Sequence, residues 1–196
     1  MARNIVGIIL AGGQSSRFGS PKAFVKKDNI PFYQYSWQAI KPFVSSTLII
    51  TNPLLEALFA KDNVPIKMVN DHNLYQGQGP LAGIYTAMDV LIAEWYMIVP
   101  VDVPFVEQWI FEWLITFIAE DVVAIIPVVN GKNEPLLSLY HYSLKKEIKK
   151  QLDKGERSMH QLLADKKVIY VPIEEEKPFT NINRQEDYQR FIQNKD

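Results

Sequence analysis

The sequence predicts a doubly wound three-layer α/β/α fold with a mainly parallel sheet, and two observations lead to this prediction. Short apolar runs rich in β-branched residues alternate with amphipathic stretches along most of the chain, as expected where strands and helices follow one another. Most runs are apolar at consecutive positions, which is typical of strands that helices cover on both faces. Because crossovers between parallel strands are right-handed, we expect helices on both sides of the sheet.

Five runs have the length and composition of buried strands. They are residues 5–10, 47–51, 66–69, 95–101 and 122–129. Four stretches between them carry apolar residues at helical spacing, with Pro or polar residues near their starts. These are residues 31–41, 54–60, 81–94 and 106–119. The tryptophans Trp95, Trp109 and Trp113 fall on apolar faces, so we expect them in the core.

The alternation becomes less regular after about residue 130. There we expect strands at 136–140 and 168–172, and helices at 143–152, 158–164 and 184–194. No Gly/Ser-rich linker separates this part from the rest, and a length of 196 residues fits one domain. We therefore predict a single domain over residues 1–196.

The composition excludes several kinds of chemistry. The chain has no cysteine and only three histidines, so disulfides, thiolate nucleophiles and Cys-ligated metals are ruled out. Its net charge of −1 does not favour a nucleic acid partner, whose phosphates attract basic proteins. No signal peptide pattern opens the sequence, and no apolar run approaches the ~20 residues that span a bilayer. We expect a cytoplasmic protein with neither a membrane nor a nucleic acid partner.

A glycine-rich segment follows the first expected strand, where a parallel sheet presents its ligands. Gly12 and Gly13 let the backbone bring N–H groups close to phosphate oxygens, and Arg17 and Lys22 add positive charge. The spacing matches neither the Walker loop nor the dinucleotide fingerprint. Residues 1–30 contain five basic side chains and one acidic one, which favours an anion site over the alternative of a solvated surface turn.

Asp102 follows the most apolar of the expected strands and lies between Pro100 and Pro104. A carboxylate in this place suits Mg²⁺, which binds through one or two carboxylates together with phosphates and water. The alternative is that Asp102 is the N-cap of the next helix. The two interpretations are compatible.

Other candidates follow strands or precede helices. Asn52 comes after the second expected strand, and Asn70 and Asp71 come after the third. Gly77 and Gly79 precede a helix and can offer backbone N–H groups to a base or a phosphate. Helix capping alone would also explain the two glycines.

Several segments match known motifs in order and spacing. Residues 10–22 (LAGGQSSRFGSPK) resemble the Leu-Ala-Gly-Gly-x-Ser-x-Arg-x-Gly-x-x-Lys signature of nucleotidyltransferases, and residues 101–105 (VDVPF) resemble their metal-binding Asp segment. Further matches are GPLAGI (79–84), EPLLSLY (134–140), GERS (155–158) and TNINRQEDY (180–188). As a set, they resemble the molybdenum cofactor guanylyltransferases, a MobA-like family. The resemblance runs from residue 5 to about 191 and implies a Rossmann-like nucleotidyltransferase fold.

The resemblance implies roles for individual residues. Positions expected to contact GTP are Leu10, Gly12, Gly13, Lys22, Asn52, Asp71 and Asp102, to which we add Ala11 and Gly79. Asp102 would also hold Mg²⁺. Asn181 and Asn183 would face the pterin acceptor, with a capping turn as the alternative. The sequence departs from the family pattern at Phe18, where Met is usual, and at Arg184-Gln185, which replaces Thr-Pro.

The implied reaction transfers GMP from GTP to the terminal phosphate of molybdenum-loaded molybdopterin and releases pyrophosphate. A phosphate monoester is largely ionised at pH 7 and needs no protein base, which agrees with the scarcity of histidine. We hypothesise that Lys22, Arg17 and Asp102 are catalytic. Mg²⁺ on Asp102 would bridge the reacting phosphates, and Lys22 and Arg17 would stabilise the leaving group. Residues 1–130 would then be the nucleotide- and metal-binding part, and 131–196 the acceptor side.

Two alternatives stay open. An enzyme of the same fold could use CTP with molybdopterin, or a sugar or polyol phosphate as acceptor, because the glycine-rich loop and Asp102 do not select the base. A nucleotide-binding regulator without turnover is the other alternative. The expected substrates are GTP and molybdenum-molybdopterin and the expected cofactor is Mg²⁺. The resemblance extends the expected partners to other proteins of molybdenum cofactor biosynthesis.

Overall fold

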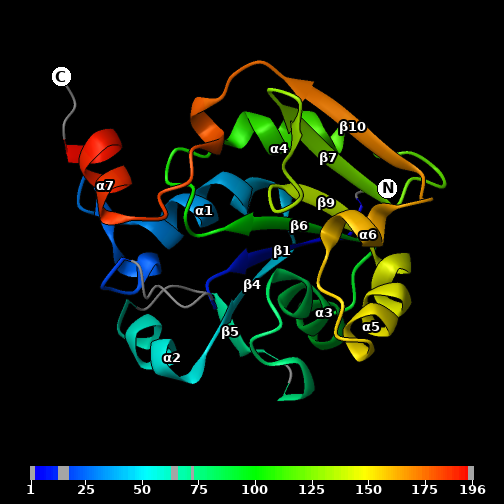
Figure 1. The fold of residues 1–196 in the computed structure, drawn as a ribbon, viewed down its shortest axis with the longest axis horizontal. Coiled ribbons are helices and arrows are strands. Elements are labelled where there is room, and N and C mark those ends of the chain that lie inside the picture. Colours follow the sequence, from blue (N-terminus) through cyan, green and yellow to red (C-terminus); the bar gives the residue numbers. More distant parts are fainter. Residues whose placement is uncertain (1–2, 13–17, 63–65, 72, 194–196) are drawn as a thin grey trace.

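The computed structural model describes residues 3–12, 18–62, 66–71 and 73–193. Its central sheet contains β1 (Ile5–Leu10), β4 (Ser46–Thr51), β5 (Lys67–Asn70), β6 (Trp95–Pro100), β7 (Ala124–Val129), β8 (Lys132–Asn133), β9 (Ser138–His141) and β10 (Val168–Ile173). The strand order is β10-β7-β9-β6-β1-β4-β5, with β8 paired to β7 (Figure 1). A small separate hairpin joins β2 (Lys26–Lys27) and β3 (Ile30–Pro31).

The sheet is mainly parallel, as the sequence predicts. β1 pairs in parallel with both β4 and β6, β4 with β5, and β7 with β10. β9 is antiparallel to β6 and to β7, and β8 is antiparallel to β7. The carboxyl ends of β5, β4, β1 and β6 therefore meet at one edge of the sheet, where ligands of such folds bind.

Helices cover both faces of the sheet (Figure 1). One face packs against α1 (Phe32–Ile40), α2 (Pro53–Phe59) and α4 (Gln108–Ile115), and the other against α3 (Pro80–Val90), α5 (Lys145–Asp153) and α6 (Met159–Leu163). Alternate residues of β1 serve the two cores, with Ile5 and Ile9 in the first and Val6 and Ile8 in the second. This alternation explains why the strand is apolar throughout. The predicted α/β/α class is confirmed.

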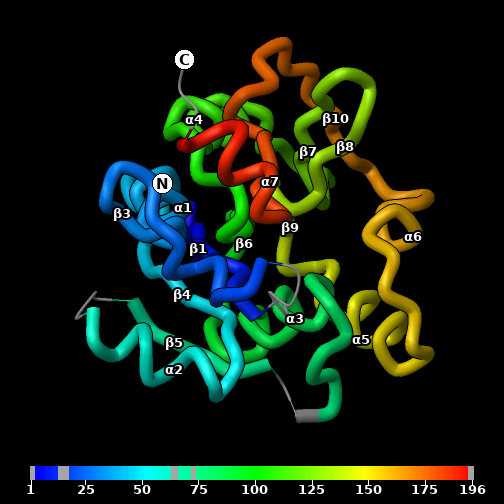
Figure 2. Tube along the Cα trace, turned by 60° about the vertical axis from the view of Figure 1, so that its left-hand side comes forward, coloured from blue at the N-terminus to red at the C-terminus, as the bar shows by residue number. Residues whose placement is uncertain are grey.

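The C-terminal helix α7 (Gln185–Tyr188) continues as a π-helical turn, Gln189–Gln193. It lies beside the β2–β3 hairpin near the start of the chain (Figures 1 and 2). The Tyr188 hydroxyl donates a hydrogen bond to the Lys26 carbonyl at 2.8 Å. The last segment is thereby joined to the segment that follows the first strand.

Two predicted helices are shorter than expected. The helix predicted for 81–94 ends at Val90, because the chain turns at Leu91, whose carbonyl accepts a hydrogen bond from the Tyr96 hydroxyl at 2.8 Å. The helix predicted for 106–119 spans Gln108–Ile115, and the next residues form single turns.

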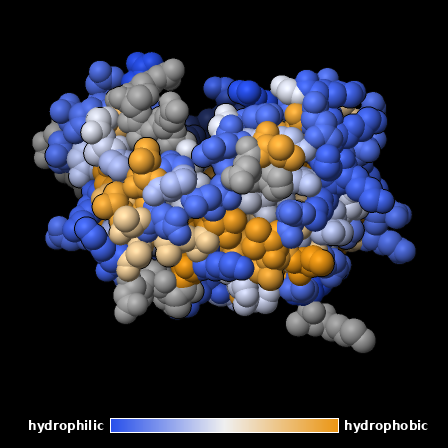
Figure 3. All heavy atoms as spheres, turned by 90° about the horizontal axis from the view of Figure 1, so that it is seen from below, coloured by the Kyte–Doolittle hydropathy of each residue, from blue (hydrophilic) through white to orange (hydrophobic). Residues whose placement is uncertain are grey.

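The prediction that all three tryptophans lie in the core is wrong for one of them. Trp95 is 1% exposed, whereas Trp113 is 50% exposed on the outer side of α4. The face seen from below in Figure 3 also shows apolar side chains among hydrophilic ones. α2 lies on this side, and its Leu54 is 87% exposed. Within the described part of the chain, no helix is both long and apolar enough to cross a membrane.

Candidate active site

A cavity of about 480 Å³ opens at the edge where β5, β4, β1 and β6 end. Seven residues predicted to bind substrates or metal line it: Leu10, Gly12, Lys22, Asp71, Gly79, Asp102 and Asn181. The remaining lining residues that are described are Ala23, Ile50, Gly77, Pro80, Gly83, Pro100, Val101 and Leu136. Residues from distant parts of the sequence are therefore brought to one site.

The first strand carries its chain directly into this cavity. Beyond β1, the Ala11 N–H donates to the Ile50 carbonyl at 2.8 Å, and the Leu10 carbonyl accepts from Val101 N–H at 3.2 Å. These two bonds hold the end of β1 between β4 and β6, so that Gly12 enters the cavity at a fixed place. Ala11 itself is buried and does not line the cavity.

One end of the cavity is charged: Lys22 and Asp102 line it, and the exposed Asn183 contacts Lys22. The Lys22 ammonium lies 3.4 Å from Asp102 Oδ2 and donates to Asn183 Oδ1 at 2.6 Å. The Lys22 and Asp102 side chains are 16% and 23% exposed, so water screens their charges only in part. Three segments, 161 positions apart at the extremes, thus form one polar cluster, the charged end.

Local structure fixes each member of the charged end. Lys22 begins a 3₁₀ turn after Pro21, and the next residue, Ala23, is 2% exposed. Asp102 lies just beyond β6, and its carbonyl accepts a hydrogen bond from Ile182 N–H at 2.8 Å. Asp102 is not the N-cap of α4, which begins at Gln108 after Glu107. The alternative that Asp102 serves as a helix cap is therefore wrong.

Another part of the cavity, the glycine end, is formed by Gly77, Gly79 and Gly83 around Asp71. Gly79 has φ +80° and is the N-cap of α3, with Pro80 at the first helical position. A Cβ at Gly83 would lie 2.9 Å from Leu10 Cδ2 and 3.7 Å from Asp71 Oδ1. Glycine at 83 therefore lets α3 approach the strand ends closely.

Asp71 is the titratable group of the glycine end. Burial raises its pKa above the ordinary value of 3.8, and a hydrogen bond from the Gly77 backbone opposes the shift. Its buried Oδ1 atom has no hydrogen-bond partner among the described residues. A buried carboxylate oxygen without a donor is costly, and a ligand with N–H groups would satisfy it.

A polar contact on the outside braces the segment that carries Asp71 and the two glycines. The Tyr75 hydroxyl donates to Asp153 Oδ1 on α5, and Lys149 Nζ lies 2.7 Å from Asp153 Oδ2. This hydrogen bond raises the pKa of Tyr75, and Lys149 together with Tyr75 lowers the pKa of Asp153. The segment between β5 and α3 is thus attached to the helix layer as well as to the sheet.

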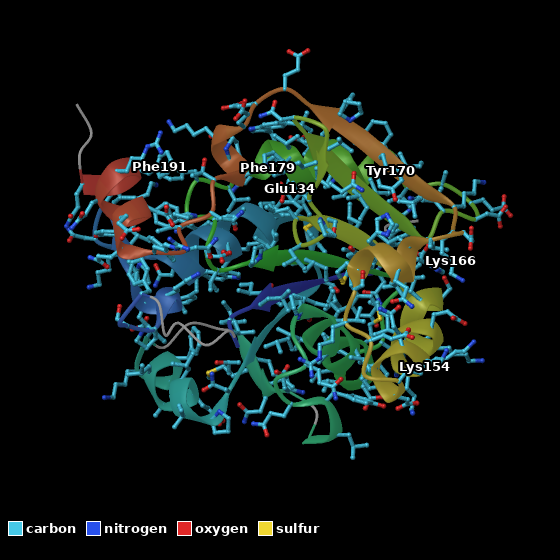
Figure 4. The ribbon with its side chains drawn as sticks, in the orientation of Figure 1. Glu134, Lys154, Lys166, Tyr170, Phe179 and Phe191 are labelled. Atoms are coloured by element: carbon cyan, nitrogen blue, oxygen red, sulfur yellow. The ribbon has the colours of Figure 1, made fainter. Side chains whose placement is uncertain are left out.

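The turn before β9 contributes to the wall of the cavity. Leu136 lines the cavity, and the Glu134 carbonyl, which opens the turn, accepts a hydrogen bond from Leu137 N–H at 3.1 Å. Figure 4 labels Glu134 in this turn. Burial raises the pKa of the Glu134 carboxyl, and Lys132 opposes the shift. The motif at 134–140 therefore contributes a wall of the cavity.

Some predicted site residues are placed elsewhere. Asn52 is the N-cap of α2, its side chain accepts a hydrogen bond from Leu54 N–H at 3.1 Å, and it does not line the cavity. Its predicted contact with the nucleotide stays a prediction. Gly13 and Arg17 lie outside the described residues. The sequence analysis missed Gly83 and the contact between Asn183 and Lys22. The signal for Gly83 was a glycine inside a helical pattern, which often marks close packing.

A positively charged side chain and a carboxylate at the carboxyl edge of a doubly wound sheet are the groups expected at the site of a nucleotidyltransferase. The chain belongs to the MobA-like NTP transferase domain family, which it matches over residues 7–168. A probable molybdenum cofactor guanylyltransferase of Bacillus cytotoxicus is 37% identical over 194 residues, covering 97% of each chain.

Solved structures share the fold. The molybdopterin-guanine dinucleotide biosynthesis protein A of Archaeoglobus fulgidus has a TM-score of 0.77 at 24% identity, covering 96% of this chain and 97% of that one. A protein of Mycobacterium tuberculosis solved in complex with manganese has a TM-score of 0.71 at 12% identity, with coverage of 97% and 99%. At these identities the likeness establishes the nucleotidyltransferase fold.

Proposed function

We propose that this protein transfers GMP from GTP to the terminal phosphate of molybdenum-loaded molybdopterin, with release of pyrophosphate. The observation that carries the proposal is that Lys22, Asp102 and Asp71 line the same cavity. A triphosphate matches the charged end and a base matches the glycine end. The curated relative named as a guanylyltransferase is similar along nearly its whole length.

Asp102 is the residue that would hold Mg²⁺. Its carboxylate lines the cavity and already has a cationic partner, the Lys22 ammonium at 3.4 Å. Among the described residues, no cluster of three His, Cys, Asp or Glu side chains could hold a metal alone. The other ligands would come from phosphates and water, which is the coordination that Mg²⁺ prefers. When bound, the ion would cancel negative charge between the two substrates.

The residues of the chain supply position and charge rather than a base. The acceptor phosphate is mostly a dianion at pH 7, and none of the described lining residues is histidine. Lys22 would stabilise the charge that develops on the pyrophosphate, together with Arg17 and the Gly12 and Gly13 backbone N–H groups. Asn181, which lines the cavity, would contact the acceptor. Such a site works by holding both substrates in line.

Asp71 favours guanine over cytosine. The base edge of guanine carries two adjacent donors, the N1–H and the N2 amino group, which match the two oxygens of one carboxylate. Cytosine presents one amino donor beside acceptor atoms, and these acceptors would face the Asp71 carboxylate. Because Asp71 Oδ1 is buried without a partner among the described residues, the base that offers two donors gains more.

Pyrophosphate release tests the proposal. The purified protein is given molybdenum-loaded molybdopterin with GTP or CTP, with Mg²⁺ or with EDTA. We expect release with GTP and Mg²⁺, and at least tenfold less with CTP. Equal turnover with CTP would overturn the assignment of the base. Absence of turnover with every nucleotide, in protein whose melting temperature GTP raises, would indicate a binding protein instead.

A further inference from the structure

The C-terminal segment reaches the cation of the nucleotide side through Asn183. The Asn183 amide oxygen accepts a hydrogen bond from Lys22 Nζ at 2.6 Å, whereas the ion pair of Lys22 with Asp102 is longer, at 3.4 Å. The amide is neutral, so it orients the ammonium without cancelling its charge. The carboxylate of Asp102 both orients and neutralises it.

Asn183 is fixed by contacts on both sides of it. Its neighbour Ile182 is 0% exposed and packs with Phe18 and Phe32, and the Ile182 N–H donates to the Asp102 carbonyl at 2.8 Å. On the other side, the Asn183 N–H donates to Asp187 Oδ2 at 2.9 Å. The amide oxygen is therefore presented to Lys22 by a backbone that does not depend on the contact itself.

Asp102 and Asn183, the two partners of Lys22 described above, differ in what happens when substrates bind. A divalent cation on Asp102 would repel the ammonium and replace the ion pair. The contact with Asn183 would survive, because it involves no carboxylate. A lysine side chain is long and flexible, and fixing it in advance strengthens its contact with a phosphate.

We propose that Asn183 is a positioning residue that holds the Lys22 ammonium at the phosphate end of the cavity. The segment expected to meet the acceptor thus also sets the position of the cation that binds the nucleotide. This inference rests on the proposed function, because it assumes that Lys22 contacts the triphosphate. It assigns to Asn183 an action on GTP that is separate from any contact with the pterin.

A double-mutant cycle on GTP affinity tests the inference without turnover. GTP binding is measured by calorimetry in EDTA for the wild type, Asn183→Ala, Lys22→Ala and the double variant. We expect Asn183→Ala to weaken binding about fivefold to tenfold, since a hydrogen bond to a charged group is lost. In the Lys22→Ala background, the same change should alter affinity less than twofold.

Two further variants complete the experiment. Gln185→Ala lies two positions away on an exposed surface and should bind GTP like the wild type. Asn183→Asp keeps the acceptor oxygen but adds a negative charge beside the triphosphate, so GTP should bind more weakly than in Asn183→Ala. Thermal unfolding confirms that each variant is folded, which we expect because the Asn183 residue is exposed.

The outcomes separate this inference from the proposed function. The positioning role would be overturned if Asn183→Ala reduced GTP affinity equally in the wild type and in the Lys22→Ala background. It would also be overturned if Lys22→Ala lost GTP affinity and Asn183→Ala did not. An effect confined to the KM of the acceptor would overturn it too and would leave Asn183 as a pterin contact. If Lys22→Ala itself binds GTP like the wild type, the placement of the triphosphate in the proposed function fails first.

Discussion

The charged end and the glycine end of the cavity are assembled in different ways. Lys22, Asp102 and Asn183 come from three distant segments and meet through polar contacts. The glycine end comes from a short part of the sequence, from Asp71 after β5 to Gly83 near the start of α3, and its shape depends on the absence of side chains at the glycines. Charged and polar side chains define one end, and the absence of side chains at the glycines defines the other.

The difference predicts how each end responds to mutation. Loss of the Lys22 charge at the charged end should slow the chemical step far more than it weakens GTP binding, because the rest of the cavity still contacts the nucleotide. An added atom at the glycine end should weaken nucleotide binding and leave the chemical step intact. The split between kcat and KM therefore measures whether the two ends act as separate units.

The largest effect is expected for Lys22→Ala. Removing the ammonium takes away charge stabilisation at the leaving group, and kcat should fall by ~10²–10³-fold, as when one oxyanion donor is lost. Pyrophosphate release at saturating GTP measures this change. Lys26→Ala is the matched control, because Lys26 is exposed on β2 and belongs to the same basic stretch. A kcat within threefold of the wild type would remove Lys22 from the catalytic group.

Asp71→Asn should show opposite effects on binding and on stability. Losing the carboxylate should weaken GTP binding by about 10- to 100-fold, because a charge-assisted hydrogen bond disappears. The nucleotide-free variant should be more stable than the wild type at pH 7. Burial raises the pKa of Asp71 above 3.8, so the folded state holds the proton more tightly, and ionising this group costs stability as the pH rises through that window.

Thermal unfolding from pH 4 to pH 8 checks the sign of the Asp71 effect. The gap in melting temperature between Asp71→Asn and the wild type should widen as the pH rises from 4 and then level off. A gap that is independent of pH would contradict the burial argument. A variant that gains stability but keeps full GTP affinity would show that Asp71 does not contact the base.

Gly83→Ala tests whether the absence of a side chain at this position determines how the glycine end binds GTP. The new methyl group would lie 2.9 Å from Leu10 Cδ2 and 3.2 Å from Ile50 Cγ2. Overpacking costs about 1–3 kcal/mol, and the better helix propensity of alanine returns about 1 kcal/mol. We expect the KM for GTP to rise by up to about tenfold with kcat nearly unchanged.

Val90→Ala, at the exposed end of the same helix, is the control for Gly83→Ala and should leave both constants unchanged. A loss in kcat at Gly83→Ala with an unaltered KM would break the division between the two ends.

The sequence predicted the charged end better than the glycine end, for a physical reason. Lys22 and Asp102 follow apolar strands, and parallel strands bring their carboxyl ends together whatever the details of packing. At Gly83, α3 lies close to Leu10 and Ile50. This close approach depends on how two surfaces pack together, so a local sequence pattern does not predict it. The same holds for Asn183, because its distance from Lys22 depends on the path of the whole C-terminal segment.

The sequence analysis did not predict the two short hairpins, although their turn residues are of types that favour hairpins. β7 and β8 are joined at Asn130 and Gly131, both with positive φ, which is a common two-residue hairpin pair. The β2–β3 turn uses Asp28 and Asn29, again with positive φ. β2, β3 and β8 are each two residues long, too short for a hydrophobic period to emerge.

The smallest effect is expected for the contact of Tyr75 with Asp153, which holds the segment of the glycine end against α5. Asp153→Asn replaces the acceptor of the Tyr75 hydroxyl and removes the ion pair with Lys149. Lys149 and Tyr75 lower the pKa of Asp153, so its contribution to stability is present above the ordinary pKa of 3.8 and is lost as the pH falls through the lower folded value. The KM for GTP should rise about twofold to fivefold, the range for an exposed pair.

Tyr75→Phe, which removes only the hydroxyl, should raise KM at least as much, because it abolishes the hydrogen bond that Asp153→Asn only weakens. Lys149→Ala keeps the Tyr75–Asp153 hydrogen bond and should leave KM within twofold of the wild type. If Lys149→Ala raises KM as much as Tyr75→Phe does, the segment is held by the charge on α5 rather than by the hydroxyl. The glycine end would then depend on charge as well as on space, and the contrast between the two ends would be weaker than the cavity alone suggests.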